Sequence, residues 1–396
     1  DKKWDAIVQN VTELCAEIEI EQLPTREKAE KPTIYIAGDS TAQTYNYTKV
    51  YPQTGWGQVF ADYFNDDIII ENRAMGGRSS KSYDNDGRLD RILTEMHPGD
   101  YVFIQFGIND GAENKPERYI SVEDYKKLIT DKYIGEVEKR GGTPVLMTAN
   151  AAAWWDEENN CFMESRKDYA DPTREIAEET GCKFIDENKI VTDAWNSMSK
   201  NRVLSGYFIC EPLESKAYPS GTNDTTHMKA KGAKRVAKLI ADAIPENVPE
   251  LAKYLKGDET FTDIQGHWAE DVIKTLAEND KVSGVGDGKF NPDGTVTRAE
   301  FLKMAMDSLG IVGHAYRDGE CLDATNDDWY CYYLQGALDK DIIPKEMIEN
   351  CNVTKVTKTL AEATDDKEAV TTDVNVYTGK FDGDKPITRE EMAAIA

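Results

Sequence analysis

The stretch Thr33-Ile-Tyr-Ile-Ala-Gly-Asp-Ser-Thr41 is a short apolar run that ends in a glycine, an aspartate and a serine. Runs of this kind, rich in β-branched and aromatic residues, are typical of buried strands. Glycine permits a tight turn, and open α/β sheets bind ligands at the carboxyl ends of their strands. We therefore expect the Ser40 hydroxyl at the ligand-binding edge of a sheet. Taken alone, Ser40 fits a helix N-cap equally well.

Outward from this stretch, short apolar runs alternate with amphipathic segments, the pattern of β-α units that feed a parallel sheet. The fold class predicted for residues 31–245 is α/β, a three-layer α/β/α sandwich with a mostly parallel sheet. The expected strands are residues 33–37, 68–71, 101–106, 144–148 and 183–185. The expected helices are residues 57–64, 88–96, 122–139, 172–180 and 229–244.

A general base near neutral pH is most often histidine, and the chain has four. His97 precedes a Pro-Gly turn, and two others lie in the C-terminal region. His227 follows Asp224 by three residues, just before the last helix of the α/β region. This spacing lets a carboxylate orient one ring nitrogen while the other faces a nucleophile. The alternative for Asp224 and His227 is a solvated turn that caps the helix.

Two further loops follow expected strands. Asn72-Arg-Ala-Met-Gly-Gly-Arg-Ser79 has glycines that bring backbone N–H groups close to a ligand, and Gly107-Ile-Asn-Asp110 offers an amide side chain. Each alone fits an ordinary turn. Together with the Ser40 turn, they place a hydroxyl, a backbone donor and an amide donor at one edge of the sheet. The sequence has no G-x-S-x-G motif, which argues against an α/β-hydrolase elbow.

Five stretches of the sequence carry a resemblance, and they are Ala37-Gly-Asp-Ser-Thr-Ala, Thr54-Gly-Trp-Gly, Ala74-Met-Gly-Gly-Arg-Ser, Phe106-Gly-Ile-Asn-Asp-Gly and Asp224-Thr-Thr-His. As an ordered set they resemble the SGNH (GDSL-type) hydrolases, and more narrowly their rhamnogalacturonan acetylesterase branch. The resemblance covers residues 31–245. It implies a serine carboxylic ester hydrolase that removes O-acetyl groups from plant cell-wall polysaccharide such as rhamnogalacturonan or xylan, without cofactor or metal. By position, Ser40 is the nucleophile, His227 the base and Asp224 its orienting group. The Ser40 and Gly77 N–H groups and the Asn109 side chain bind the oxyanion.

The chain carries 47 Lys and Arg against 73 Asp and Glu, a net charge of −26, which disfavours nucleic acid as a partner. An acidic pectic substrate then requires a locally positive groove. We expect Arg78 or Arg88 to contact a sugar carboxylate, and Trp56 to stack on a sugar ring. The alternatives are that the arginines pair with nearby aspartates and that Trp56 packs in the core.

After residue 260 the pattern changes. Phe261-Thr-Asp-Ile-Gln-Gly-His-Trp-Ala and Val296-Thr-Arg-Ala-Glu resemble a surface-layer homology repeat, a small all-α unit that anchors proteins to secondary cell-wall polymers. Repeat 1 is expected over 261–311 and repeat 2 over 316–396, truncated at its end. Trp329 and Arg389 are 60 positions apart where Trp268 and Arg298 are 30 apart, so repeat 2 holds an insertion between 344 and 385. By position, the polymer-binding residues are Trp268, Arg298, Trp329 and Arg389. Helix capping by Thr297, with Arg298 merely exposed, is the alternative.

The remaining predictions concern organisation and location. Residues 1–30 are expected to be an N-terminal segment, which fits the tail of an upstream domain, and 246–260 a linker. No apolar run approaches the length of a membrane span, and seven scattered cysteines indicate no zinc site. The resemblance implies an extracellular protein on a bacterial, Gram-positive, cell surface. Two other functions stay open: an esterase acting on lipid, thioester or peptidoglycan acetyl groups, and a non-catalytic wall-binding protein.

Overall fold

The computed structural model describes residues 26–257, 261–278, 282–314, 321–325, 327–361 and 370–395. Most of the predicted N-terminal segment and residues 258–260 of the predicted linker lie outside these ranges. The chain divides into two compact units, each described here by itself. The first contains the described residues up to Thr48, then Gln53–Met198 and Thr225–Lys256; the second contains Lys49–Pro52, Ser199–Asp224 and the residues from Gly257 onward.

A five-stranded sheet forms the centre of the first unit, in the order β2-β1-β3-β4-β7. All four neighbouring pairs are parallel. The strands are β1 (Thr33–Gly38), β2 (Ile69–Asn72), β3 (Tyr101–Gln105), β4 (Thr143–Met147) and β7 (Lys183–Ile185). Every residue of β1 is buried, as expected for a strand covered on both faces. The five predicted strands and their parallel arrangement are confirmed.

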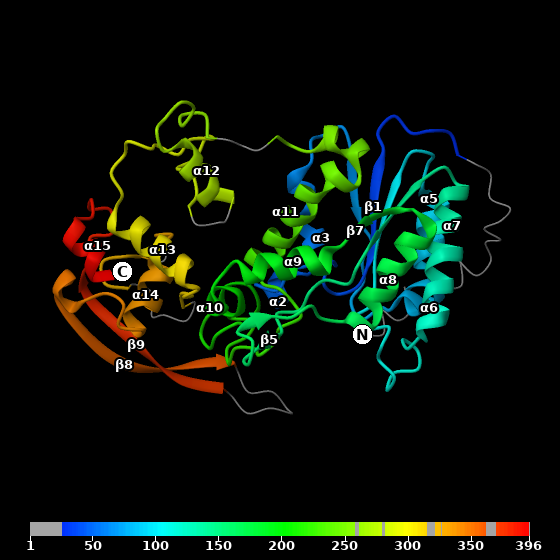
Figure 1. The fold of residues 1–396 in the computed structure, drawn as a ribbon. Helices are drawn as coiled ribbons and strands as arrows, with labels where there is room; N and C mark the ends of the chain where they lie inside the picture. Colours follow the sequence, from blue (N-terminus) through cyan, green and yellow to red (C-terminus); the bar gives the residue numbers. More distant parts are fainter. Residues whose placement is uncertain are drawn as a thin grey trace. The chain divides into compact units, whose positions relative to one another are not determined.

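Helices cover both faces of this sheet, which gives the predicted three layers (Figure 1). Tyr35 and Ala37 of β1 point toward one face, whose core includes Tyr83, Tyr125 and Tyr133. The helices on that side are α4 (Ser80–Asn85), α5 (Arg88–Glu95), α6 (Val122–Leu128), η3 (Ile129–Ile134), α7 (Gly135–Lys139) and α8 (Lys167–Thr180). On the other side lie α3 (Trp56–Val59), η2 (Phe60–Tyr63), α9 (Glu187–Asn196) and α11 (Ala230–Asn247).

Two smaller features complete this unit. The strands β5 (Trp155–Asp156) and β6 (Cys161–Phe162) form an antiparallel pair after β4. Past α11, the chain continues as the 3-10 helix η5 (Pro249–Tyr254), where Leu251 is fully buried. Part of the predicted linker is therefore folded onto the first unit, because an apolar side chain in the stretch has a core to pack against. The short helix α2 (Tyr47–Val50) follows the Ser40 turn and belongs to neither unit alone, since the division between the units falls after Thr48.

The second unit combines helices with one long hairpin. Its helices are α10 (Lys200–Val203), η4 (Leu204–Phe208), α12 (Glu270–Glu278), α13 (Arg298–Leu309), α14 (Cys331–Asp339), η6 (Lys345–Met347) and α15 (Arg389–Ile395). The insertion predicted between 344 and 385 forms an antiparallel hairpin of β8 (Glu349–Ala361) and β9 (Val370–Lys380). The repeat region is thus not purely helical. A shared core joins α13, α14 and α15.

Candidate active site

Ser40 and His227 meet at the carboxyl end of β1. The Ser40 Oγ and the His227 Nε2 lie 2.8 Å apart, a hydrogen-bond distance, although 187 positions separate them in the chain. Two contacts hold the loops in place: Tyr45 donates its hydroxyl to the Ser40 carbonyl at 2.7 Å, and the Ala153 N–H donates to the Thr225 carbonyl at 2.8 Å. A hydroxyl and an imidazole in this arrangement form the core of a nucleophile and base pair.

Two backbone N–H groups near Ser40 are available to a ligand. Among the described residues, neither the Ser40 N–H nor the Gly77 N–H has a hydrogen-bond partner, whereas the Gly76 N–H donates to the Gln43 side chain. Gly77 has a φ of 72°, which an L side chain rarely adopts, and a Cβ there would lie 3.2 Å from Arg118 Nη2. Both the conformation and the close approach require glycine. The available donors agree with the choice of Gly77 over Gly76.

Asn109 lies beside the Gly77 loop. Its Nδ2 donates to the Arg78 carbonyl at 3.0 Å, which leaves the second amide hydrogen for another acceptor. The Arg118 Nη1 lies 3.5 Å from Asn109 Oδ1. A guanidinium beside the amide oxygen favours the orientation in which the NH₂ group points away from Arg118.

Asp110 connects these two loops. Its fully buried carboxylate accepts hydrogen bonds from the Ser80 N–H at 2.8 Å, the Ser80 hydroxyl at 2.6 Å and the Gly107 N–H at 2.8 Å. Burial raises the pKa of Asp110 to about 6, although these hydrogen bonds favour the ionised form. The carboxylate therefore ties the loop of Gly77 to the loop of Asn109.

Asp39 shapes the turn that presents Ser40. It is buried, and its Oδ1 accepts from the N–H and the hydroxyl of Thr41, each at 2.8 Å. Burial raises the pKa of the Asp39 carboxyl, while the Thr41 hydrogen bonds and the charges of His227 and Arg166 oppose that rise. Asp224, the predicted orienting group, is half-buried three residues before His227. Its role stays a prediction.

Of the three residues predicted to contact substrate, one is buried in the core and two are paired with an aspartate. Trp56 was expected to stack on a sugar, but its side chain is fully buried and its indole N–H donates to Gln105 Oε1 at 3.1 Å. That prediction is wrong, because a core indole has no face open to a ligand. Arg78 and Arg88 both approach Asp86, at 2.8 and 3.8 Å. Their contact with substrate stays a prediction, with their charge already partly balanced.

One of the four predicted polymer-binding residues is also corrected. Arg298 is 7% exposed, and its guanidinium donates to the Phe381 carbonyl at 2.5 Å and pairs with Glu391. It stabilises the packing between the two repeats and is not available to a polymer. Trp268 and Trp329 are 90% and 52% exposed, and Arg389 is also exposed. Polymer binding by these three stays a prediction.

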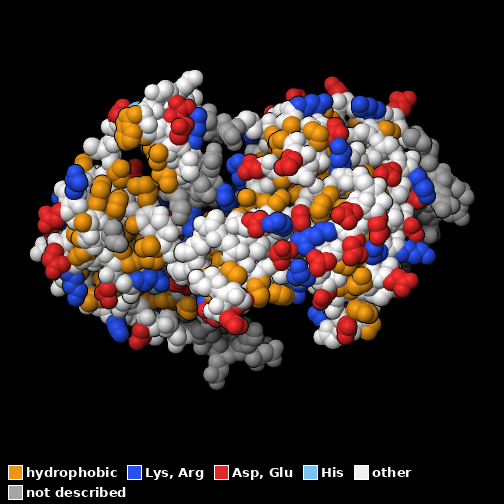
Figure 2. All heavy atoms as spheres, in the orientation of Figure 1, with side chains coloured by type: hydrophobic (Ala, Val, Ile, Leu, Met, Phe, Trp, Pro, Cys, Tyr) orange, Lys and Arg blue, Asp and Glu red, His pale blue; other side chains and the backbone are white. Residues whose placement is uncertain are grey.

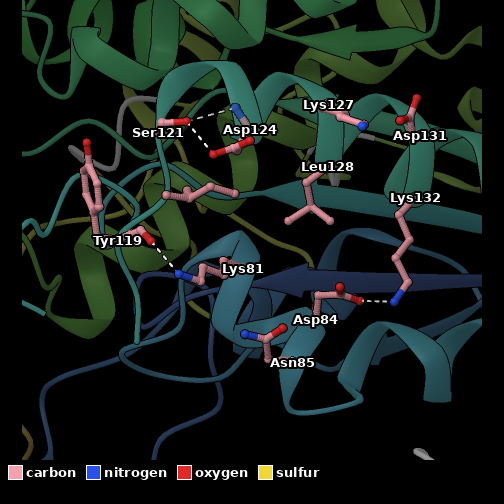
Figure 3. Close-up of a pocket in the computed structure, with 11 residues that line it drawn as sticks. Lys81, Asp84, Asn85, Tyr119, Ser121, Asp124, Lys127, Leu128, Asp131 and Lys132 are labelled. Carbon is pink, nitrogen blue, oxygen red and sulfur yellow. Dashed lines mark hydrogen bonds and ion pairs between the residues drawn. The ribbon is translucent and has the colours of Figure 1, made fainter. Parts of the chain in front are cut away.

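A hollow lies elsewhere in the first unit, between α4 and α6. Figure 3 shows two of its lysines already engaged: Lys132 with Asp84 at 2.5 Å, and Lys81 with the Tyr119 carbonyl at 3.1 Å. No nucleophile and base pair lines it. Within the described residues, no group of three or more His, Cys, Asp or Glu is placed to hold a metal. No described helix combines the length and apolarity required to cross a bilayer.

The sequence analysis gave no role to Asp110, Arg118 or Arg166. Asp110 stands in the quoted Gly107 loop, so its position was visible but its partner Ser80 was not. Arg118 and Arg166 have no local signal, because each is brought to the site by contacts with distant loops. Acidic and basic side chains are intermixed on the face of the molecule drawn in Figure 2.

The parallel sheet and the Ser40 and His227 pair define a serine hydrolase. The chain belongs to the GDSL-like lipase/acylhydrolase family, whose model matches residues 36–235, and it is a carboxylic ester hydrolase. The S-layer homology domain model matches residues 260–302. The chain is 36% identical to the probable rhamnogalacturonan acetylesterase YesY of Bacillus subtilis over 213 residues, which are 54% of this chain and 92% of that protein.

Two further relatives are similar over slightly more than half of the chain. The rhamnogalacturonan acetylesterase RhgT of Bacillus subtilis is 32% identical over 216 residues, which are 54% of this chain and 89% of that protein. Among solved structures, the crystal structure of the Bacillus subtilis protein YxiM is 29% identical and covers 56% of each chain, with a TM-score of 0.45.

Proposed function

We propose that this enzyme removes O-acetyl groups from an acetylated plant cell-wall polysaccharide such as rhamnogalacturonan or xylan. The observation that carries the proposal is the 2.8 Å contact between Ser40 Oγ and His227 Nε2 at the edge of the sheet. The rhamnogalacturonan acetylesterases similar to this chain, each covered over most of its length, support the choice of substrate.

In the proposed reaction, Ser40 Oγ attacks the acetyl carbonyl carbon and gives its proton to His227 Nε2. The negative charge that develops on the carbonyl oxygen is bound by the N–H groups of Ser40 and Gly77 and by Asn109 Nδ2. Each such donor is worth about 2.7 to 4 kcal/mol in the transition state. Asp224 holds the imidazole so that Nε2 faces the serine.

Collapse of the intermediate breaks the bond to the sugar oxygen, which leaves with the proton that His227 holds. The acetyl group is then bonded to Ser40. Water gives a proton to His227 and attacks this ester, and the serine recovers the proton when acetate leaves. The sugar hydroxyl and acetate are the products, and the enzyme returns to its starting state.

The test is acetate release from acetylated rhamnogalacturonan, acetylated xylan, acetylated peptidoglycan and p-nitrophenyl acetate, with Ser40→Ala as the comparison. We expect acetate from the plant polymers, and at least a thousandfold loss in the variant. Activity that survives the Ser40→Ala change would contradict the serine mechanism. Hydrolysis of p-nitrophenyl acetate without release from either plant polymer would contradict the substrate.

We also propose that the repeats hold the enzyme to a cell-wall polymer at a bacterial surface, through Trp268, Trp329 and Arg389. The exposed indole of Trp268, in the region that matches the S-layer homology domain, supports this. Sedimentation with purified cell walls is the test. Trp268→Ala should reduce the bound fraction severalfold, while Val272→Ala, also at an exposed position, should not. Equal binding to walls stripped of their secondary polymer would refute the proposal.

A further inference from the structure

Arg166 is the N-cap residue that precedes helix α8, and it has an unusual backbone conformation. Its φ of 57° lies in the left-handed region, which costs a non-glycine residue about 1 to 2 kcal/mol. The N–H groups of Tyr169 and Ala170 donate to its carbonyl at 3.0 and 2.9 Å and hold it there. Strained residues of this kind concentrate at ligand-binding and catalytic sites.

The Arg166 side chain has unused hydrogen-bond donors. Its guanidinium carbon lies 4.7 Å from the ring centroid of Trp154, and within the described residues it makes no hydrogen bond or ion pair. Arg174, on the same helix, pairs with Glu164, Asp171 and Asp186. In a chain with 73 acidic residues, a half-buried arginine without a carboxylate partner is available for one brought by a ligand.

This side chain belongs to the same rim as the nucleophile. The Ala152 N–H donates to the hydroxyl of Ser165, the residue before Arg166, at 2.8 Å. The next residue, Ala153, donates to the Thr225 carbonyl at 2.8 Å, two positions before His227. Burial lowers the pKa of the Arg166 guanidinium, and the negative charge of Asp39, beside Ser40, opposes that shift.

Resting on the proposed function, we infer that Arg166 and Trp154 form a subsite for an acidic sugar of the substrate, with the guanidinium binding the uronate carboxylate. The planar guanidinium matches a carboxylate with two parallel hydrogen bonds. Trp154, which is 37% exposed, offers apolar surface to the sugar ring beside it. This pair is named the uronate subsite.

The uronate subsite would provide the positive charge that a strongly acidic protein needs to bind an acidic polymer. A protein of net charge −26 repels a polyanionic polymer, so binding requires a local cation whose charge is not already neutralised. Arg78 and Arg88 share Asp86, whereas Arg166 makes no ion pair among the described side chains, although the charge of the buried Asp39 acts on it. Arg166 is therefore better suited to a substrate carboxylate than the two arginines predicted from the sequence.

The test compares two forms of one polymer: acetylated rhamnogalacturonan, and the same polymer with its carboxyl groups reduced to alcohols. We expect Arg166→Gln to lower kcat/KM on the acidic polymer roughly 10-fold to 100-fold more than on the reduced polymer. Arg166→Lys, which keeps the charge but not the fork, should lie between. Trp154→Leu should lower kcat/KM on both polymers to the same extent. The matched control is Arg91→Gln, an exposed arginine paired with Glu95, which should leave the ratio unchanged.

Salt provides a second readout. Added salt screens the overall repulsion equally in both proteins, so the difference in preference for the acidic polymer between the wild-type enzyme and Arg166→Gln should shrink as salt is added. If Arg166→Gln lowered kcat/KM equally on both polymers, with a normal thermal unfolding profile, the uronate subsite alone would be refuted. A wild-type enzyme that hydrolyses p-nitrophenyl acetate but neither polymer would refute the proposed substrate and the subsite together. Activity that is unaffected by Ser40→Ala would instead refute the proposed mechanism.

Discussion

Replacing Asp110 with asparagine tests whether a buried carboxylate holds the two oxyanion loops together. The carboxylate accepts from the Ser80 N–H, the Ser80 hydroxyl and the Gly107 N–H. An amide has one acceptor oxygen, so its NH₂ group must face a backbone donor at one of the two loops. We expect kcat at pH 7.5 to fall roughly 10-fold to 100-fold on every ester, because the donors of Gly77 and Asn109 lose their alignment.

The stability of the wild-type protein relative to this variant should depend on pH, because only the wild-type protein carries the titrating carboxyl at position 110. Burial raises the Asp110 pKa from 3.8 to about 6, so the folded state binds this proton more tightly than the unfolded state. The stability that the group contributes is fully present below pH 3.8 and is lost as the pH rises through 6. Relative to Asp110→Asn, which does not titrate, the wild-type protein should gain roughly 2 kcal/mol between about pH 7.5 and 4.5.

The assay is thermal unfolding of the full chain across this pH range. For a domain of this size the expected gain corresponds to roughly 4–8 °C in the difference between wild-type and variant Tm. Other titrating groups cancel in that difference. Asp131→Asn, at an exposed carboxylate on η3, serves as the control and should show a constant difference. A difference for Asp110→Asn that does not change with pH would refute the raised pKa. Unchanged kcat would refute the positioning role.

Three further outcomes follow from the geometry. Gly77→Ala should keep the fold but lower kcat at least tenfold on p-nitrophenyl acetate, because the added methyl meets the Arg118 guanidinium at 3.2 Å; wild-type rates would contradict this. Trp56→Ala should lower the free energy of unfolding by about 3–5 kcal/mol, as a core residue does; a stable variant with only a raised KM would restore the stacking role. Arg298→Ala removes the buried guanidinium that pairs with Glu391 and donates to the Phe381 carbonyl, and should destabilise the second unit by about 1–3 kcal/mol, measured by thermal unfolding, with wall binding compared at a temperature where it remains folded.

The central sheet was predictable because local composition determines it. The run that begins at Thr33 is continuously apolar, and a strand buried on both faces leaves that mark in the sequence. The β8–β9 hairpin was not predicted, yet Val353-Thr-Lys-Val-Thr-Lys-Thr359 is a β-branched run that favours a strand. The insertion was recognised by its length, and this run was not used to assign its structure.

The site was only partly predictable. The predicted nucleophile Ser40 and the Gly77 loop follow strand ends, and the predicted base His227 precedes the last helix of the first unit, α11. Trp56 was misplaced because an indole suits both a sugar ring and a core, and local sequence does not distinguish the two; the residue begins a helix, and its indole enters the core beside Gln105. Arg298 was misplaced because its burial depends on Glu391, which is 93 positions away. Local sequence gives no information about a partner that far along the chain.

The buried acids near the nucleophile show why motif residues and reacting residues differ. Asp39 and Asp110 stand next to Ser40 and Asn109 in the sequence, yet each directs its carboxylate inward to backbone donors of its own loop, Thr41 and Gly107. Burial raises the pKa of both, so each ionised group costs folding free energy at neutral pH. The fold retains them because an ionised carboxylate accepts several N–H bonds at once and fixes a turn more tightly than a neutral side chain. The acids shape the turns, and the side chains of their neighbours Ser40 and Asn109 are thereby left for the roles proposed for them toward the ester.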